Sequence, residues 1–280
     1  MTIKTIGNIT DDETLWRYMS LDKLVNLLET KMLYFAPLES YRYTDPFEGY
    51  VPDVAAKTYC EVQGFFVKGL EEVFKCIESK PDINRENLDK TKSMLANYRH
   101  STQAAYEKLA KEITVNCWHQ NISESEAMWR LYSDDNKGVA IKTSVKSLIS
   151  SFGEYDKTIN LGKVKYIDFA DRNLNLRDCK VDGHSVPLLK RSSFEHEKEV
   201  RCFIFSNAIV GGCDIKVEAS PNYVPVCTET LIEQIFISPF AKEPFNSSVF
   251  AICKKYNFDE KVVQSDLLDS GSFLRKLTDW

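Results

Sequence analysis

The pattern of polar and apolar residues changes most sharply within residues 194–205, where a charged half is followed by an apolar half. Alternate residues of a β-strand lie on opposite faces, so a strand here would place Glu197, Glu199 and Arg201 on one face. The second half is apolar on both faces, which is typical of an interior strand in a covered sheet. We therefore predict a strand that carries two carboxylates and a guanidinium to a cleft at the point where it enters the sheet.

The same charges also fit a simpler arrangement, namely a solvated strand end with cross-strand ion pairs. The two interpretations differ in the surroundings that they give to Glu197 and Glu199. In a cleft of low dielectric the two carboxylates would push their pKa values apart, which favours acid–base chemistry and is costly for stability. The pattern alone leaves both interpretations open.

Nearer the N-terminus, the pattern predicts a compact β-α-β unit. Residues 15–19 alternate as a half-buried strand, Ser20 is placed to cap a helix that ends near Thr30, and a short apolar strand follows. The unit delivers Arg17 and Tyr18 just before a helix N-terminus, where a phosphate can be bound. On this segment alone, a pairing of Arg17 with a surface carboxylate is the simpler alternative.

A loop with unusual composition follows at residues 41–50, which contain four aromatic residues together with Asp45 and Glu48. Its Asp-Pro and Gly residues favour irregular structure. Solvated loops rarely carry so many rings. We expect either a lid packed over a core or a loop whose rings and acids line a site.

The remaining pattern predicts one α+β domain over residues 1–280, with a mixed central sheet and a helical insertion at 54–113. Beyond the insertion, the helix that begins after Ser125 presents Trp129 and Tyr132 on one side. For Trp129, core filling is the simpler role. Further strands are expected at 114–118, 139–143, 164–169, 231–238 and 261–265, and a helix at 247–256.

Composition narrows the functional classes. The formal net charge is -5, so no global basic field attracts nucleic acid or membranes, and any such contact has to be local. Eight cysteines occur without a Cys-x-x-Cys pair and four histidines do not cluster near them, which argues against a metal site. No apolar stretch is long enough to span a bilayer. We expect a cytoplasmic protein with reduced thiols.

Five short motifs occur in a recognisable order: Leu-Trp-Arg-Tyr-Met-Ser at 15–20, Asp-Pro-Phe-Glu at 45–48, Met-Trp-Arg-Leu-Tyr at 128–132, Glu-x-Glu-x-Arg at 197–201 and Ile-Phe-Ile-Ser-Pro at 235–239. In this order they resemble a bacterial domain-of-unknown-function family that is often found near phage-defence genes. The resemblance covers most of the chain outside the insertion. It implies a toxin or anti-phage effector, with an antitoxin protein as a partner.

The order of elements is also similar to the layout of ADP-ribosyltransferases, in which a first strand binds NAD through a basic residue and a late strand carries the catalytic Glu. The middle hydroxyl motif of those enzymes has no clear counterpart here. The resemblance implies NAD as cofactor and catalytic roles for Arg17 and for Glu199 or Glu197. Further cofactor contacts are expected from Tyr18, Ser20, Asp45, Glu48, Trp129 and Tyr132, and contacts with a nucleic-acid or protein acceptor from Lys190, Arg191 and Arg201.

Two other classes of function compete with this interpretation. A metal-independent nuclease could perform acid–base and phosphate chemistry with Glu197, Glu199, Arg201, Lys190 and His196. A sensor or binding module without enzymatic activity would use the aromatic loop at 41–50 and the helical insertion as its surface.

Overall fold

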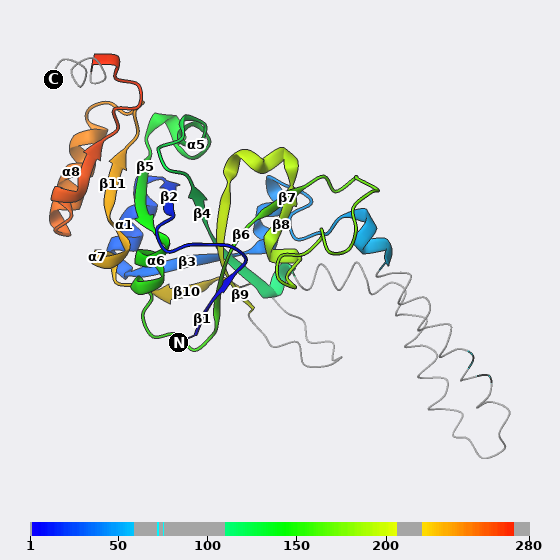
Figure 1. The fold of residues 1–280 in the computed structure, drawn as a ribbon. Helices are drawn as coiled ribbons and strands as arrows, with labels where there is room; N and C mark the ends of the chain where they lie inside the picture. The colour runs from blue at the N-terminus through cyan, green and yellow to red at the C-terminus, as the bar shows by residue number, and fades with distance from the viewer. Residues whose placement is uncertain (1, 59–71, 73–74, 76–109, 206–219, 272–280) are drawn as a thin grey trace.

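Figure 1 shows the computed structural model of the protein, which describes residues 2–58, 72, 75, 110–205 and 220–271. The helical insertion predicted for residues 54–113 lies mostly outside the described residues, and it stays a prediction. In the described part of the chain, no helix is long and apolar enough to cross a membrane.

A large mixed sheet forms the centre of the fold, so the predicted combination of helices with a mixed sheet is confirmed at this level. The main path of this ten-stranded sheet runs in the order β1-β6-β9-β4-β2-β5-β11-β12, and β3 and β10 branch from it at β4. The β1–β6 and β11–β12 pairs are parallel, and the others are antiparallel. The strands are β1 (Ile3–Ile6), β2 (Thr14–Met19), β3 (Met32–Pro37), β4 (Ile113–Gln120), β5 (Val139–Ser144), β6 (Ile159–Lys163), β9 (Glu199–Phe205), β10 (Asn222–Pro225), β11 (Gln234–Ile237) and β12 (Val262–Gln264).

The sheet divides along one edge of β4. β9 pairs with the whole length of one edge, from Ile113 to His119. On the other edge, β3 pairs with Thr114 and Val115, whereas β2 pairs with His119 and Gln120. Residues 116–118 therefore lie at a fork, where β2 and β3 diverge.

Short helices and a second small sheet surround the large one (Figure 1). The small sheet joins β7 (Lys165–Ile167) to β8 (Leu189–Arg191). The α-helices are α1 (Leu21–Thr30), α5 (Glu126–Tyr132), α6 (Val145–Ser151), α7 (Thr228–Leu231) and α8 (Phe245–Lys255), and the 3-10 helices are η1 (Leu38–Tyr43), η2 (Asp134–Asn136), η3 (Val186–Leu188), η4 (Ser192–Glu197) and η5 (Asp259–Lys261).

Two predicted helix caps have different outcomes. Ser125 Oγ accepts a hydrogen bond from the Met128 backbone N–H at 3.4 Å, so the cap of α5 is confirmed. Ser20 occupies the N-cap position of α1, but its side chain makes no capping hydrogen bond. The prediction that its hydroxyl caps α1 is wrong, because this hydroxyl bonds to the side chain of Asp22 instead.

Each face of the sheet has its own core. The largest apolar cluster covers one face and includes Leu15, Trp118 and Cys202, together with residues from α1, α6 and α8. On the other face two smaller clusters form, one around Phe203 and the other around Trp129. The charged residues of β9 and β8 lie on this second face.

The predicted strand over residues 194–205 is shorter than expected. Residues 192–197 form η4, and Lys198 has a left-handed backbone with φ 40° before β9 begins. A left-handed residue interrupts the two-residue period of a strand. Glu199 and Arg201 therefore share a strand face as predicted, but the prediction that Glu197 belongs to the same strand is wrong.

Candidate functional site

Two charged side chains extend from the start of β9 to one face of the sheet. Arg201 is fully buried, and its Nε donates to Glu199 Oε2 at 2.6 Å while its Nη2 donates to Glu199 Oε1 at 3.2 Å. Burial alone would lower the Arg201 pKa, but the charges of Glu199 and Glu48 outweigh it and raise the pKa well above its usual value. Arg201 is therefore charged, and it holds the Glu199 carboxylate in one orientation.

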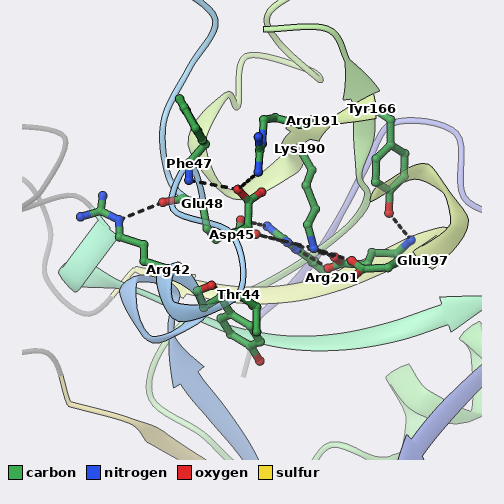
Figure 2. A network of polar contacts seen from close by, with 12 residues as sticks. Arg42, Thr44, Asp45, Phe47, Glu48, Tyr166, Lys190, Arg191, Glu197 and Arg201 are labelled. Carbon is green, nitrogen blue, oxygen red and sulfur yellow. Dashed lines mark hydrogen bonds and ion pairs between the residues drawn. The ribbon is translucent and has the colours of Figure 1, made fainter. Parts of the chain in front are cut away.

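A second carboxylate reaches Arg201 from the loop after η1. Arg201 Nη1 donates to Glu48 Oε1 at 2.8 Å, and Nη2 donates to Glu48 Oε2 at 3.1 Å (Figure 2). Gly49 turns the chain directly after Glu48 with φ +81°, and a Cβ there would lie 3.0 Å from Ala110 Cβ. Arg42 Nε also donates to the Glu48 carbonyl oxygen at 3.0 Å. The bidentate geometry makes this loop an integral part of the site.

Lys190 on β8 joins the carboxylates into one network. Its Nζ donates to Glu199 Oε1 at 2.6 Å and to Glu197 Oε2, and it lies 3.7 Å from Glu48 Oε2. Burial alone would lower the Lys190 pKa, but these three carboxylates raise it above its usual value. The single positive charge of Lys190 is therefore shared among three carboxyl groups. We refer to Glu48, Lys190, Glu197, Glu199 and Arg201 as the charge network.

The two predicted catalytic carboxyls have opposite proton affinities. Burial, followed by a hydrogen bond to Glu199 and the charge of Glu199, raises the pKa of Glu197 to about 7. Burial also acts to raise the pKa of Glu199, but Arg201 and Lys190 outweigh it and bring that pKa well below its usual value. The Glu197 side chain keeps 12% of its surface exposed. At neutral pH, Glu199 is thus ionised and Glu197 is ready to gain or lose a proton.

Strand β4 adds two further polar residues to the same face. Its register pairs Cys117 with Arg201 and His119 with Glu199. Cys117 is a half-buried free thiol, and burial and then Glu199 raise its pKa. His119 Nδ1–H donates to the Glu197 carbonyl oxygen at 2.6 Å, and burial lowers the His119 pKa. Its Nε2 is buried and has no hydrogen-bond partner among the described residues.

Three tyrosines approach the charge network. Tyr166 accepts a hydrogen bond from the Glu199 backbone N–H at 2.8 Å through its hydroxyl oxygen. Tyr132 was predicted from the sequence, and it is 44% exposed while burial and then the charges of Glu197 and Glu199 raise its pKa. Tyr41 on η1 is half-buried, and burial is the largest cause of its raised pKa. Tyr132 thus remains accessible beside the carboxyl pair.

Sequence reasoning did not identify Cys117, His119 or Tyr166, whereas Tyr41 belongs to the aromatic loop at 41–50 that was expected to form a lid or to line a site. A two-residue period over 113–120 would have placed Cys117 and His119 on one face of a strand. Nothing comparable identifies Tyr166, because it reaches the site from the separate small sheet.

Arg17 does not share a face with the carboxyl pair. On β2 it pairs with Ile141 of the main core, whereas the neighbouring Trp16 pairs with His119 on the face of the charge network. The catalytic roles expected for Arg17 and Glu199 would require the two side chains to face each other, and they do not, because successive strand residues point to opposite faces. The guanidinium carbon of Arg17 lies 5.7 Å from the centroid of the Trp118 ring, at the fork of the sheet.

The fork nevertheless connects Arg17 to the charge network through Tyr41. Burial lowers the Arg17 pKa, and the nearby Tyr41 and Cys117 act in the opposite direction. The positive charges of Arg17 and Arg201 both act to lower the pKa of Tyr41, so the Tyr41 phenol lies within electrostatic range of both guanidinium groups. Among the described residues, the Arg17 side chain has no ion pair and no hydrogen bond, and its described contact is with the Trp118 ring. Arg17 is therefore a half-buried cation without a described counter-ion.

The other predicted cofactor contacts from β2 and α5, Tyr18 and Trp129, are bonded and packed within the protein. Tyr18 is buried, its hydroxyl accepts a hydrogen bond from the Ser125 backbone N–H at 2.8 Å, and its ring lies edge-on to Trp129 at 4.9 Å. Trp129 is fully buried, and its Nε1 donates to Glu124 at 2.9 Å. Both rings fill the core in this structure. Ser20 is half-buried at the start of α1.

Asp45 and Arg191 form a separate pair at the edge of the network (Figure 2). Arg191 Nη2 donates to Asp45 Oδ1 at 2.5 Å, and the same oxygen accepts a hydrogen bond from the Phe47 backbone N–H at 3.0 Å. Asp45 is buried, whereas the Arg191 side chain is partly exposed. The acids of the aromatic loop thus line the site, and each of them has a basic partner from β8 or β9.

Comparison with known proteins gives one match. Residues 128–202 match a family model described as a protein of unknown function (DUF2971). No curated protein and no solved structure matches the chain. The matched segment contains Lys190, Glu197, Glu199 and Arg201, whereas Glu48 lies outside it. The match supports the resemblance to a family of unknown function and assigns no chemistry.

The geometry is suited to proton transfer. A partly exposed carboxyl with a pKa of about 7 lies beside a carboxylate that stays ionised. Pairs of carboxyls with separated pKa values are a common arrangement for general acid–base catalysis. Arg17 and Tyr41 place a cation and a hydroxyl at the adjoining fork.

Proposed function

We propose that the protein is a NAD-dependent ADP-ribosyltransferase in which Glu197 is the general base. The observation that supports this most is the separation of the two carboxyls: Glu197 has a pKa of about 7 and is partly exposed, whereas Glu199 is buried and ionised. A base works best when its pKa lies near the operating pH. Both oxygens of Glu199 are already bonded to Lys190 and Arg201, which makes Glu199 a positioning residue.

The proposed reaction balances with one proton transfer. The bond between ribose C1′ and the nicotinamide nitrogen breaks, and its electron pair leaves with nicotinamide. The acceptor oxygen or nitrogen forms a bond to C1′ and gives its proton to the Glu197 carboxylate. Positive charge develops on the sugar, so the negative charge of the network favours the transition state over the ground state. NAD supplies the ADP-ribosyl group, and in this proposal Arg17, the half-buried cation at the fork, contacts its phosphates.

The biological setting is a further part of the proposal. The resemblance to proteins encoded near phage-defence genes favours a bacterial toxin or anti-phage effector that acts in the cytoplasm and is neutralised by an antitoxin protein. The match to a family of unknown function over residues 128–202 is compatible with this setting.

The proposed activity can be tested with labelled NAD. Purified protein is incubated with the NAD and with cell lysate, and nicotinamide release and the labelled product are measured. We expect Glu197→Gln to lower NAD consumption by about 100-fold or more, because the general base is lost. Glu195→Gln is the matched control, since Glu195 belongs to the same η4 but is exposed. Wild-type NAD consumption by Glu197→Gln would refute the role of Glu197.

The pH profile provides a second readout of the same role. A base must be ionised to act, so the rate of NAD consumption should rise with pH through about 7, the pKa of Glu197. A rate that is independent of pH between about 5 and 8 would contradict the proposal.

A nuclease is the second candidate, because a carboxyl with a near-neutral pKa also serves strand cleavage. Glu197 together with His119 and Lys190 provides acid–base groups and a cation on one face. Cleavage of labelled RNA by the purified protein without NAD would favour this function over ADP-ribosyl transfer.

A further inference from the structure

We propose that the surface formed by Phe47, Arg191 and Phe194 binds a base of a single-stranded nucleic acid. This surface, called here the ring surface, would hold the acceptor, and that role rests on the ADP-ribosyl transfer proposed above. The binding itself does not depend on it.

The ring surface combines two aromatic rings with one cation that lies close to both of them. The Arg191 guanidinium carbon lies 4.5 Å from the Phe47 ring centroid and 5.3 Å from that of Phe194. Phe47 is 50% exposed, and Arg191 and Phe194 are half-buried. Flat π faces that reach solvent beside a guanidinium are the elements with which proteins bind unpaired bases.

One buried carboxylate organises this surface in advance. Asp45 Oδ1 accepts hydrogen bonds from both Arg191 Nη2 and the Phe47 backbone N–H, at 2.5 and 3.0 Å (Figure 2). The same atom thus fixes the guanidinium and the backbone that carries the first ring. Such preorganisation reduces the entropy lost when a ligand binds.

The ring surface is continuous with the charge network. Lys190 Nζ lies 4.7 Å from the Phe194 ring centroid, and the same Nζ donates hydrogen bonds to Glu197 and Glu199. The exposed His196 ring stacks on Phe194 with a centroid distance of 6.5 Å. Lys190 therefore links a base stacked on this surface to Glu197, the proposed general base.

The charge balance favours bases over phosphates as the recognised group. The net charge of the chain is -5, and the guanidinium of Arg191 is already paired with Asp45. Electrostatic attraction to a phosphate backbone is therefore weak, and stacking has to supply most of the affinity. Bases are free to stack in this way only in single strands, where no partner strand covers them.

The experiment measures binding without NAD, so its result is separate from that of the activity assay. Fluorescently labelled DNA and RNA single strands of about 12 nucleotides are titrated with the protein, together with the matching duplex and an abasic strand of equal charge. Phe47→Ala removes the exposed ring, and Phe47→Trp restores a larger one. Tyr223→Ala is the matched control, because Tyr223 is also an exposed aromatic residue beside another ring, with a centroid distance of 5.4 Å to Tyr34.

We expect Phe47→Ala to weaken single-strand binding by about tenfold, Phe47→Trp to retain it, and the duplex and the abasic strand to bind at least about tenfold more weakly than the single strand. Tyr223→Ala should bind like the wild type. Equal binding by Phe47→Ala and wild type, or by the abasic and normal strands, would overturn the proposal. A separate titration with NAD alone completes the series, and a Phe47→Ala loss confined to NAD would assign the base to the dinucleotide and overturn the single-strand assignment. If Glu195→Gln loses NAD consumption as Glu197→Gln does, the result argues against the proposed function. It leaves the single-strand assignment unaffected.

Discussion

The two faces of β9 are built from alternate residues of one strand, yet they depend on different physics. On one face, Val200, Cys202 and Ile204 enter the main apolar core. On the other, Glu199 and Arg201 belong to the charge network. Apolar contacts are non-directional, so loss of one leaves the rest in place. A buried charge depends on each partner, because removal of one leaves another uncompensated. The network face should therefore be far less tolerant of substitution than the apolar face.

The largest expected effect comes from the centre of the network. Arg201→Met should lower the free energy of unfolding by about 3–5 kcal/mol, because Glu48 and Glu199 lose their shared partner inside the protein. Chemical denaturation measures this change. A loss below about 1 kcal/mol would mean that the carboxylates find water or protons at little cost.

The second effect depends on pH and isolates Glu197. Its pKa of about 7 in the folded protein lies above the ordinary Glu value, so the folded state binds the proton more tightly than the unfolded state. Its contribution is complete below about pH 4.5 and is lost as the pH rises through about 7. The lowered pKa of His119 acts in the opposite direction in part of this range.

The comparison of wild type with Glu197→Gln separates these two contributions. We expect the wild type to lose about 1–3 kcal/mol relative to Glu197→Gln between these pH values. Parallel stability curves of the two proteins would show that Glu197 titrates normally. Denaturation series at several pH values provide both curves.

A smaller effect is expected on the apolar face. Ile204 is fully buried in the main core, and Ile204→Val removes one methylene group. The free energy of unfolding should fall by about 0.5–1.5 kcal/mol. If this variant is as damaging as Arg201→Met, the two faces do not differ in the way described here.

An exposed ion pair should matter least. Lys137 Nζ lies 3.0 Å from Asp135 Oδ2, and 59% and 83% of the two side chains are exposed. Lys137→Gln should change the free energy of unfolding by less than about 0.5 kcal/mol, because water screens the pair. A larger loss would show that distance alone, and not burial, sets the strength of ion pairs in this protein.

Much of the framework could be predicted from local patterns. The strands β2, β4 and β5 and the helix α1 follow from apolar periodicity, and their bounds agree with the expected segments within a few residues. The break at Lys198 could not be predicted, because a left-handed Lys has no clear sequence signal. Glu197 therefore lies at the end of η4, and Glu199 lies at the start of β9.

The composition of the site was only partly predictable. The Glu-x-Glu-x-Arg motif and the acids of the aromatic loop were identified, because unusual polar residues interrupt apolar patterns. The ion pair between the motif and the loop could not be predicted, since Glu48 and Arg201 are separated by 153 residues in the sequence. The separation of Arg17 from Glu199 could not be predicted, because the relative register of β2, β4 and β9 depends on long-range pairing.

The most direct test of the account is a measurement of the two carboxyl pKa values. Protein labelled with ¹³C at the Glu side-chain carboxyl carbon is titrated by NMR, and the Glu197→Gln and Glu195→Gln variants assign the signals. The account predicts that the Glu197 signal titrates with a pKa of about 7, whereas the Glu199 carboxyl stays ionised because its pKa lies well below the ordinary Glu value. A Glu197 signal that titrates together with the exposed Glu195 would contradict it.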